Sequence, residues 1–141
     1  MRFLAIDYGS RRTGLAVCDP AETMAFPLDV LLGQKNLVEQ IAKVVADEHI
    51  EAIVLGLPLN MDGSQGPQVQ QVMAFAERLK QRVGVPIHLQ DERLSSFGAQ
   101  EKLQMTGLSK GKQRERLDAL AAAEILQAFL ERRRGDLGMS S

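Results

Sequence analysis

Four acidic residues stand where predicted structural elements begin or end. Asp7 closes an apolar run near the N-terminus, Asp91 and Glu92 close a later one, and Asp118 lies near the start of a long helical stretch. Carboxylates gathered in one place raise one another's pKa, and a bound divalent cation removes that penalty. Hard oxygen ligands suit Mg²⁺ or Mn²⁺. The pattern therefore favours a metal-binding site built by Asp7, Glu92 and Asp118.

Each carboxylate taken alone also has an ordinary structural explanation. Asp7 could cap a turn through its side chain, and Asp91 with Glu92 could be a solvated pair ahead of a helix. Asp118 could complement the dipole at the start of its helix. However, Asp118 shares a helical stripe with apolar residues and is expected to point inward, where a charge needs a partner. The three positions together favour convergence.

Several segments offer groups that bind phosphate. The stretch from Asp7 to Gly14 resembles a phosphate-binding hairpin, because its glycines permit tight turns and close approach of backbone N–H groups. The loop after the central strand, residues 56–64, adds the neutral side chain of Asn60. The basic residues near these positions are Arg11, Arg12, Lys110, Lys112 and Arg114. Positive charge beside a carboxylate site suits a phosphodiester substrate, although a solvated surface is the ordinary role of such residues.

The elements that must position these groups can be predicted from the pattern of apolar residues. Strands are expected at residues 3–6, 14–18, 24–32, 52–57 and 85–90, with helices at about 37–45, 67–83, 96–107 and 113–133. Pro27 cannot donate to a sheet ladder, so the third strand is expected at an edge or with a bulge. Asn36 and Glu39 are spaced as a capping pair for the first helix. The short spacing of the first three strands predicts an antiparallel meander, followed by two parallel strands in one mixed five-stranded sheet flanked by helices.

Composition bounds the class of protein. The chain has 141 residues, with 17 basic and 18 acidic side chains, so its net charge is −1 and nucleic acid would have to meet a local basic patch. One domain is expected over residues 1–133, with a flexible tail at 134–141. The single cysteine suits a reducing compartment, and no run approaches the roughly 18 apolar residues of a membrane helix. We expect a cytoplasmic protein that does not engage membranes and is a monomer or weak homodimer.

Four segments are similar to motifs of the YqgF family, the Holliday-junction-resolvase-like nucleases implicated in maturing the 5′ end of bacterial 16S ribosomal RNA. The matching segments are DYGSRRTGLAV (7–17), GLPLNMDGS (56–64), DERLSS (91–96) and LDALAA (117–122). The similarity runs in order from about residue 3 to residue 130. It implies a ribonuclease-H-like fold, a metal-dependent nuclease using Mg²⁺ or Mn²⁺, and precursor ribosomal RNA or branched DNA as the substrate.

The resemblance also implies roles for single residues. Asp7, Glu92 and Asp118 would be the metal-binding catalytic carboxylates. The accessory positions would be Asp91, Arg93, Arg12 and Asn60. Resolvases proper carry their glutamate after the central strand, where this chain has Gly56-Leu57-Pro58, so the acidic role would pass to Glu92. That shift argues against junction resolution more than it argues against the metal site.

Other functions remain open at the level of sequence. A glycine-rich hairpin also suits an ATPase or a sugar kinase, but those enzymes clamp a nucleotide between two such domains and this chain has room for one. A Holliday-junction resolvase acting in recombination is a further alternative. So is a non-catalytic RNA-binding factor for ribosome assembly, because intact carboxylates indicate capacity rather than turnover.

Overall fold

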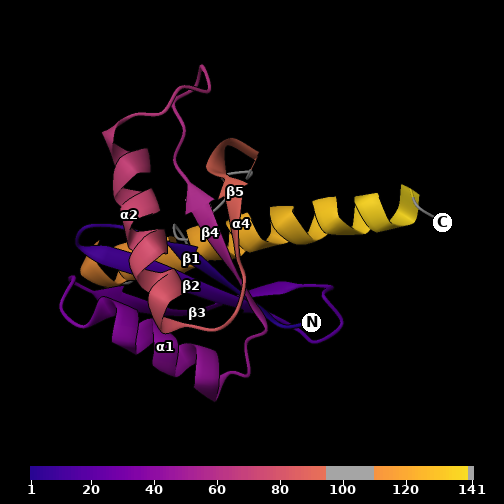
Figure 1. The fold of residues 1–141 in the computed structure, drawn as a ribbon, viewed down its shortest axis with the longest axis horizontal. Coiled ribbons are helices and arrows are strands. Elements are labelled where there is room, and N and C mark those ends of the chain that lie inside the picture. The colour runs from indigo at the N-terminus through magenta and orange to yellow at the C-terminus, as the bar shows by residue number, and fades with distance from the viewer. Residues whose placement is uncertain (95–109, 140–141) are drawn as a thin grey trace.

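The structure is a computed structural model that describes residues 1–94 and 110–139, with side chains described at 1–94 and 116–135. Five strands form one sheet in the order β3-β2-β1-β4-β5 (Figure 1). The strands are β1 (Phe3–Asp7), β2 (Arg12–Cys18), β3 (Ala25–Leu32), β4 (Ala52–Leu57) and β5 (Ile87–Asp91). The first three strands pair antiparallel, whereas β4 lies parallel to β1 and β5 lies parallel to β4. The predicted mixed sheet is confirmed.

Strand β3 shows both features expected from Pro27. It lies at the edge of the sheet, and its pairing with β2 shifts register between Leu15 and Ala16, which face Asp29 and Pro27. The bulge skips Leu28. A proline is tolerated here because the edge position and the irregular ladder remove the need for its missing N–H group.

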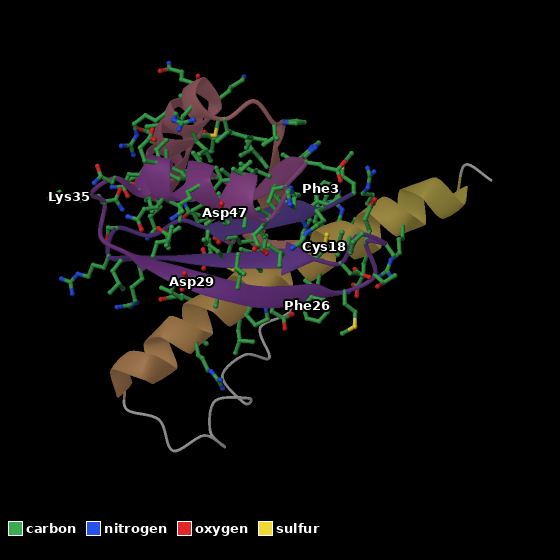
Figure 2. All side chains as sticks on the ribbon, turned by 90° about the horizontal axis from the view of Figure 1, so that it is seen from below. Phe3, Cys18, Phe26, Asp29, Lys35 and Asp47 are labelled. Carbon is green, nitrogen blue, oxygen red and sulfur yellow. The ribbon has the colours of Figure 1, made fainter. Side chains whose placement is uncertain are left out.

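Helices cover both faces of the sheet. Helices α1 (Leu37–Asp47) and α2 (Pro67–Arg82) lie over one face, and α4 (Lys110–Met139) crosses the other (Figure 2). Alternate residues of the strands feed two separate cores: Leu4 and Ile6 pack towards α1 and α2, whereas Phe3 and Ala5 pack towards α4. Asp7 continues the second series, so its side chain belongs to the face that α4 covers.

Gly14 explains how closely α4 approaches the sheet. A Cβ atom at this position would lie 2.1 Å from the backbone oxygen of Asp118, a distance no real side chain tolerates. The backbone of α4 therefore rests directly on β2 beside Asp118. Small residues continue the contact along the helix, since Ala119, Ala122 and Ala123 are all buried.

The ends of the helices agree only in part with the expectations. Pro67 occupies the first position of α2, as predicted, and α2 ends at Arg82, two residues before Gly84. At the start of α1, however, Asn36 has a left-handed backbone (φ 56°) and its side chain makes no capping hydrogen bond. The predicted capping pair is wrong, because Glu39 instead accepts a hydrogen bond from Arg82 Nε of α2 at 2.7 Å.

The final helix is longer than predicted. It begins at Lys110 rather than Gln113 and continues to Met139 rather than ending at Arg133. The helix expected at 96–107 lies outside the described residues, and the boundaries of the domain and its tail remain predictions. Within the described part of the chain, no helix combines the length and apolar character needed to cross a membrane.

Candidate functional site

The carboxyl ends of the three parallel strands meet at one edge of the sheet. Asp7 is the last residue of β1 and Asp91 the last of β5, and Glu92 opens the short 3₁₀ helix η1 (Glu92–Leu94). Strand β4 lies between them and ends at Leu57, which pairs with Asp91. This topology places side chains from sequence positions 85 residues apart on the same edge, where ligand sites form in sheets of this kind.

Gly56 makes room for the carboxylate of Glu92. A Cβ atom at Gly56 would lie 2.8 Å from Glu92 Oε1 and 2.8 Å from Ile125 Cδ1 of α4. The glycine thus leaves a slot between the sheet and α4, and the Glu92 side chain fills it. Gly56, within β4, therefore seats Glu92 and holds no acid of its own.

Asp7 and Glu92 form a close pair. They share a side-chain hydrogen bond, so one of the two oxygens involved carries a proton. The pKa of Asp7 is raised from 3.8 to about 8, first by burial, then by the hydrogen bond to Glu92 and by the negative charges of Glu92 and Asp118. Burial and the two neighbouring negative charges thus favour the protonated form of Asp7, and a cation would favour its ionised form.

Asp118 lies near this pair but points its carboxylate elsewhere. Its Oδ2 accepts a hydrogen bond from Arg12 Nε at 2.7 Å in a partly buried ion pair. The charge of Asp118 still contributes to the raised pKa of Asp7. Among the described residues, no three acidic, histidine or cysteine side chains form a cluster close enough to hold one metal ion.

The chemistry of these donors suits a hard divalent cation. Asp7 and Glu92 present carboxylate oxygens only, and the proton they share marks a place where positive charge is favoured. A cation there would replace that proton. Asp118 could join the pair only by exchanging its contact with Arg12, so the structure brings two of the three predicted ligands together and holds the third aside.

Arg93 ties the predicted accessory residues into one unit. Its Nη2 lies 2.7 Å from Asp91 Oδ2, and its Nη1 donates to the backbone oxygen of Met61 at 3.3 Å. The hydrogen bond and charge of Arg93 lower the pKa of Asp91. Arg93 therefore fastens the loop after β4 to the end of β5, directly beside Glu92.

Asn60 acts within that loop. Its Nδ2 donates to Ser64 Oγ at 2.9 Å, and its backbone N–H and carbonyl bond to Ser64 and Gly63. Gly63 adopts a φ of 86°, a left-handed conformation that favours glycine. The side chain of Asn60 stabilises the turn and does not line the cavity beside Asp7.

A cavity of about 320 Å³ opens above Asp7 and Glu92. Its remaining walls are the hairpin after β1, from Tyr8 to Ser10, the end of β4 at Gly56 with Pro58 just after it, and the first turns of α2 with Gln68 and Gln71. The sequence analysis missed these two glutamines. The signal that could have found them is Pro67, because a helix that starts just after a parallel strand points its first turn at the same edge of the sheet.

The predicted phosphate-binding residues are distributed unevenly. Arg11 is exposed on the hairpin, whereas Arg12 is engaged by Asp118. Lys110, Lys112 and Arg114 fall in the first turns of α4, and their side chains lie outside the described residues.

The model of the family described as RuvX, Holliday junction resolvase, matches residues 1–132. The chain belongs to the RuvX family. Two curated relatives, from Maridesulfovibrio salexigens and Anaeromyxobacter sp. (strain K), both carry the name "Putative pre-16S rRNA nuclease". The first is 40% identical over 94% of this chain and 99% of its own length, and the second is 44% identical over 94% and 98%. The resemblance to the YqgF nucleases is thereby confirmed.

Solved structures with the same fold include two resolvases. Thermus thermophilus RuvC, determined with a Holliday junction substrate, aligns with a TM-score of 0.61 at 18% identity and covers 96% of this RuvX chain and 97% of its own. The fowlpox virus Holliday junction resolvase aligns with a TM-score of 0.54 at 12% identity, over 93% and 99% of the two chains. At this identity the likeness shows the fold alone.

Proposed function

We propose that this RuvX protein is a metal-dependent nuclease that hydrolyses phosphodiester bonds in precursor 16S ribosomal RNA near its 5′ end. The observation that carries the proposal is the hydrogen-bonded pair of Asp7 and Glu92 beneath a cavity at the carboxyl ends of parallel strands. The names of the curated relatives supply the class of substrate. We also propose that it acts in the cytoplasm, where precursor ribosomal RNA would be its substrate, as a monomer or weak homodimer.

The carboxylates would hold a divalent cation, with Mg²⁺ or Mn²⁺ as the candidates. Asp7 and Glu92 are the ligands that the structure favours, and Asp118 is the third. A bound cation would supply positive charge to the phosphodiester and lower the pKa of a water molecule. Without its shared proton, the Asp7–Glu92 pair has oxygens free to orient such a water.

Arg12 has a distinct place in this proposal. It neutralises Asp118 in the structure, and its guanidinium is a bidentate donor suited to a phosphate group. A substrate phosphate that attracts Arg12 would leave Asp118 free to turn towards Asp7.

The flanking phosphates would be held by other basic residues, because each adds a positive charge near this edge or at the start of α4. These residues are Arg11, Lys110, Lys112 and Arg114.

The cavity offers neutral groups for the substrate. Ser10 and the amides of Gln68 and Gln71 can each donate and accept hydrogen bonds. Groups of this kind can contact a ribose 2′-hydroxyl, which also donates and accepts. This feature favours RNA over DNA without excluding branched DNA from the test.

The deciding experiment compares two substrates. The purified protein is incubated with precursor 16S ribosomal RNA and with a four-way DNA junction, each with Mn²⁺, with Mg²⁺ and with a chelator. We expect cleavage of the RNA near the mature 5′ end, only with metal, and its loss in Asp7→Asn. Cleavage of the junction alone would favour the resolvase, and an Asp7→Asn protein that cuts as fast as the unmodified one would overturn the mechanism.

A further inference from the structure

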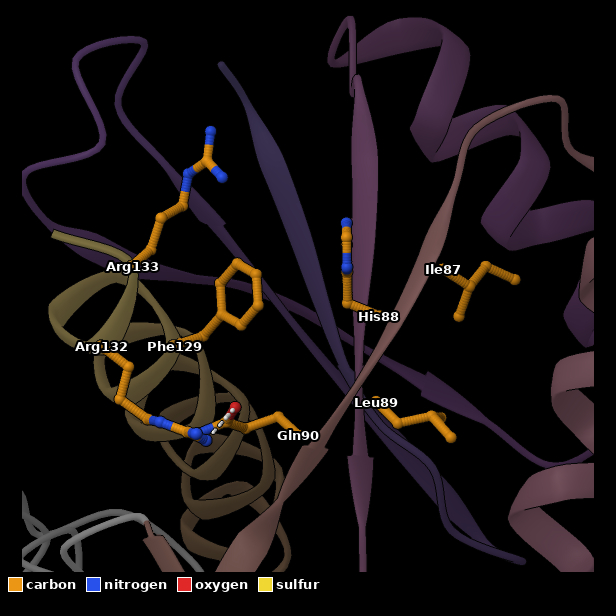
Figure 3. Close-up of a pocket in the computed structure, with 7 residues that line it drawn as sticks. All are labelled: Ile87, His88, Leu89, Gln90, Phe129, Arg132 and Arg133. Carbon is orange, nitrogen blue, oxygen red and sulfur yellow. Dashed lines mark hydrogen bonds between the residues drawn. The ribbon is translucent and has the colours of Figure 1, made fainter. Parts of the chain in front are cut away.

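A second cavity, of about 660 Å³, lies between the free edge of β5 and the C-terminal half of α4 (Figure 3). Its walls are the β5 residues from Ile87 to Gln90 and, on α4, Phe129, Arg132 and Arg133. None of these residues lines the cavity above Asp7. From the sequence, His88 is expected to pack or lie at the surface and Arg132 and Arg133 to be solvated, with no functional role.

The position of this cavity links it to the carboxylate edge. Side chains alternate along a strand, so His88 and Gln90 lie on the face of β5 that α4 covers. Glu92 follows two residues after Gln90. Its side chain reaches the same side, because both Glu92 Oε1 and Ile125 Cδ1 of α4 lie 2.8 Å from where a Cβ atom of Gly56 would be. At about 3.3 Å per residue, His88 lies roughly 13 Å from Glu92 along the chain. A ligand held at Asp7 and Glu92 could therefore extend along β5 into the second cavity.

Gln90 lines this cavity and carries an unpaired hydrogen-bond donor that is itself buried. The residue is only 3% exposed, and its Nε2 has no hydrogen-bond partner within the described part of the chain. Its Oε1 accepts a long hydrogen bond from Arg132 Nη1 at 3.5 Å. Buried amide groups are nearly always paired, so an unpaired one at the wall of a cavity indicates an absent acceptor.

The two arginines of the cavity differ in their partners. Arg133 donates to Glu22 at 2.6 Å and also lies over the ring of Phe3 at 5.4 Å, so its charge is already matched. Arg132 is exposed and forms no ion pair among the residues whose side chains are described, although its charge helps to lower the pKa of Asp91. The cavity thus combines one exposed positive charge with one unpaired amide, a combination that suits an anionic, acceptor-rich ligand.

Two aromatic rings complete the wall. The rings of His88 and Phe129 lie 5.5 Å apart at 42°, and His88 is exposed (Figure 3). The chain has no tryptophan and a single tyrosine, which is stacked on Phe75. The exposed ring of His88, tilted against Phe129, therefore offers a face on which a nucleobase can stack on this side of the molecule.

We propose that the cavity between β5 and α4 binds one nucleotide of the single-stranded RNA that flanks the phosphodiester held at Asp7 and Glu92. Its phosphate contacts Arg132 beside the buried Gln90 amide, and its base packs against His88 and Phe129. The inference rests on the proposed function, because that function supplies the RNA. An acidic peptide added to the free edge of β5 would satisfy the charge but would leave the rings without a stacking partner.

The test measures binding rather than cleavage. Full-length Asp7→Asn protein binds fluorescent single-stranded oligoribonucleotides of increasing length, with Arg132→Gln as the added change and Arg134→Gln as the matched control on the same helix. Arg134 is exposed and contacts only the backbone oxygen of Thr23, at 3.5 Å, among the contacts described for it. Thermal melting of each variant checks that the fold is retained.

We expect Arg132→Gln to weaken the binding of long oligonucleotides about tenfold and to reduce the slope of log Kd against log salt by about 0.7, as for one lost phosphate contact on a single strand. The shortest oligonucleotides should show no such difference, and Arg134→Gln should show none at any length. His88→Ala should weaken the same long oligonucleotides at least fivefold without changing the salt slope, because it removes stacking and no charge.

Equal effects of Arg132→Gln and Arg134→Gln, or effects independent of length, would overturn the inference. An Arg132-dependent affinity for a polyglutamate peptide with none for RNA would overturn it in favour of a peptide site. The cleavage assay tests the proposed function separately from this binding series. If the active protein cleaves precursor RNA but binding does not depend on Arg132, the nuclease proposal stands and the subsite proposal fails. If binding depends on Arg132 but the active protein cleaves neither substrate, the subsite proposal stands and the nuclease proposal fails.

Discussion

The carboxyl group of Asp7 couples the site to pH. Its pKa lies near 8 in the folded protein, against 3.8 for the unperturbed group, because it is buried beside Glu92 and near Asp118. Between these two values the folded protein holds a proton that the unfolded chain releases, so the free energy of unfolding falls as pH rises from about 4 to 8. A bound cation would reverse that fall, since it favours the ionised form.

Asp7→Asn removes this dependence. At pH 7 the shift corresponds to a ceiling of about 4 kcal/mol, since one pKa unit is worth about 1.36 kcal/mol. We expect Asp7→Asn to be more stable than the unmodified protein by about 1–4 kcal/mol at pH 8 with a chelator present, and by much less at pH 5. Urea unfolding at the two pH values measures the difference. Asp47→Asn, at the exposed end of α1, is the control. If Asp7→Asn gained as much stability at pH 5 as at pH 8, the titration of Asp7 would not be the cause of the gain.

Gly56 gives a second prediction for a single residue. An alanine here would place its Cβ against Glu92 Oε1 and Ile125 Cδ1, both at 2.8 Å, and both are ends of flexible side chains. We expect Gly56→Ala to displace Glu92 and weaken Mn²⁺ binding about tenfold, the usual scale for disturbing a metal ligand's support, while the protein still folds. Calorimetric titration with Mn²⁺ measures the change. In Gly84→Ala, where no atom lies within 4 Å of the added Cβ, the affinity should be unchanged.

At the scale of the elements, strands and their order followed from sequence because each has a clear physical signal. The apolar pattern at 52–57 indicated the strand that is β4, and Pro27 indicated an edge. The start of α1 did not follow, because the spacing of Asn36 and Glu39 says nothing about the backbone angle of Asn36. That angle is set by the connection from β3, which local spacing does not describe.

The contact between β2 and α4 depends on Gly14. Its Cβ would lie 2.1 Å from the backbone oxygen of Asp118 and 3.1 Å from the backbone nitrogen of Ala119, and a backbone cannot move aside as a side chain can. We expect Gly14→Ala to lower the free energy of unfolding by about 3 kcal/mol, at the upper end of overpacking. Urea unfolding measures this loss. Gly135→Ala, in the exposed part of α4 with nothing within 4 Å, should be neutral or stabilising. A Gly14→Ala protein of unchanged stability would mean that α4 does not lie this close to β2.

At the scale of the whole molecule, sequence reasoning placed Asp7 and Glu92 at one edge but could not give the direction of each side chain. The stripe of Asp118 correctly put it on the inner side of α4, yet its partner, Arg12, lies 106 residues away and no local spacing relates the two. The second cavity could not be predicted from the sequence for the same reason. It is formed by β5 and α4, which come together only through the completed sheet.

The N-terminus, the β2–β3 connection and the end of α4 are fastened together at Glu22. Its carboxylate lies 3.2 Å from the amino group of Met1 and 2.6 Å from Arg133 Nε. Beyond this point α4 continues as helix, but the last fully buried residue described on it is Leu130. We therefore expect the folded domain to end near this tie, although the helix itself runs to Met139.

Two truncations test this boundary. A chain ending at Arg133 keeps Leu130 and the ion pair with Glu22, so we expect its free energy of unfolding to stay within about 1 kcal/mol of the full chain, as for changes away from the core. A chain ending at Ala128 loses the ring of Phe129 against Phe3, at 5.1 Å, together with Leu130 and the ion pair. Losing the fully buried Leu130 and the partly buried Phe129 costs about 5 kcal/mol, which approaches the whole stability of a domain. Circular dichroism during thermal melting distinguishes the two, and a chain ending at Arg133 that failed to fold would place residues 134–141 inside the domain rather than in a tail.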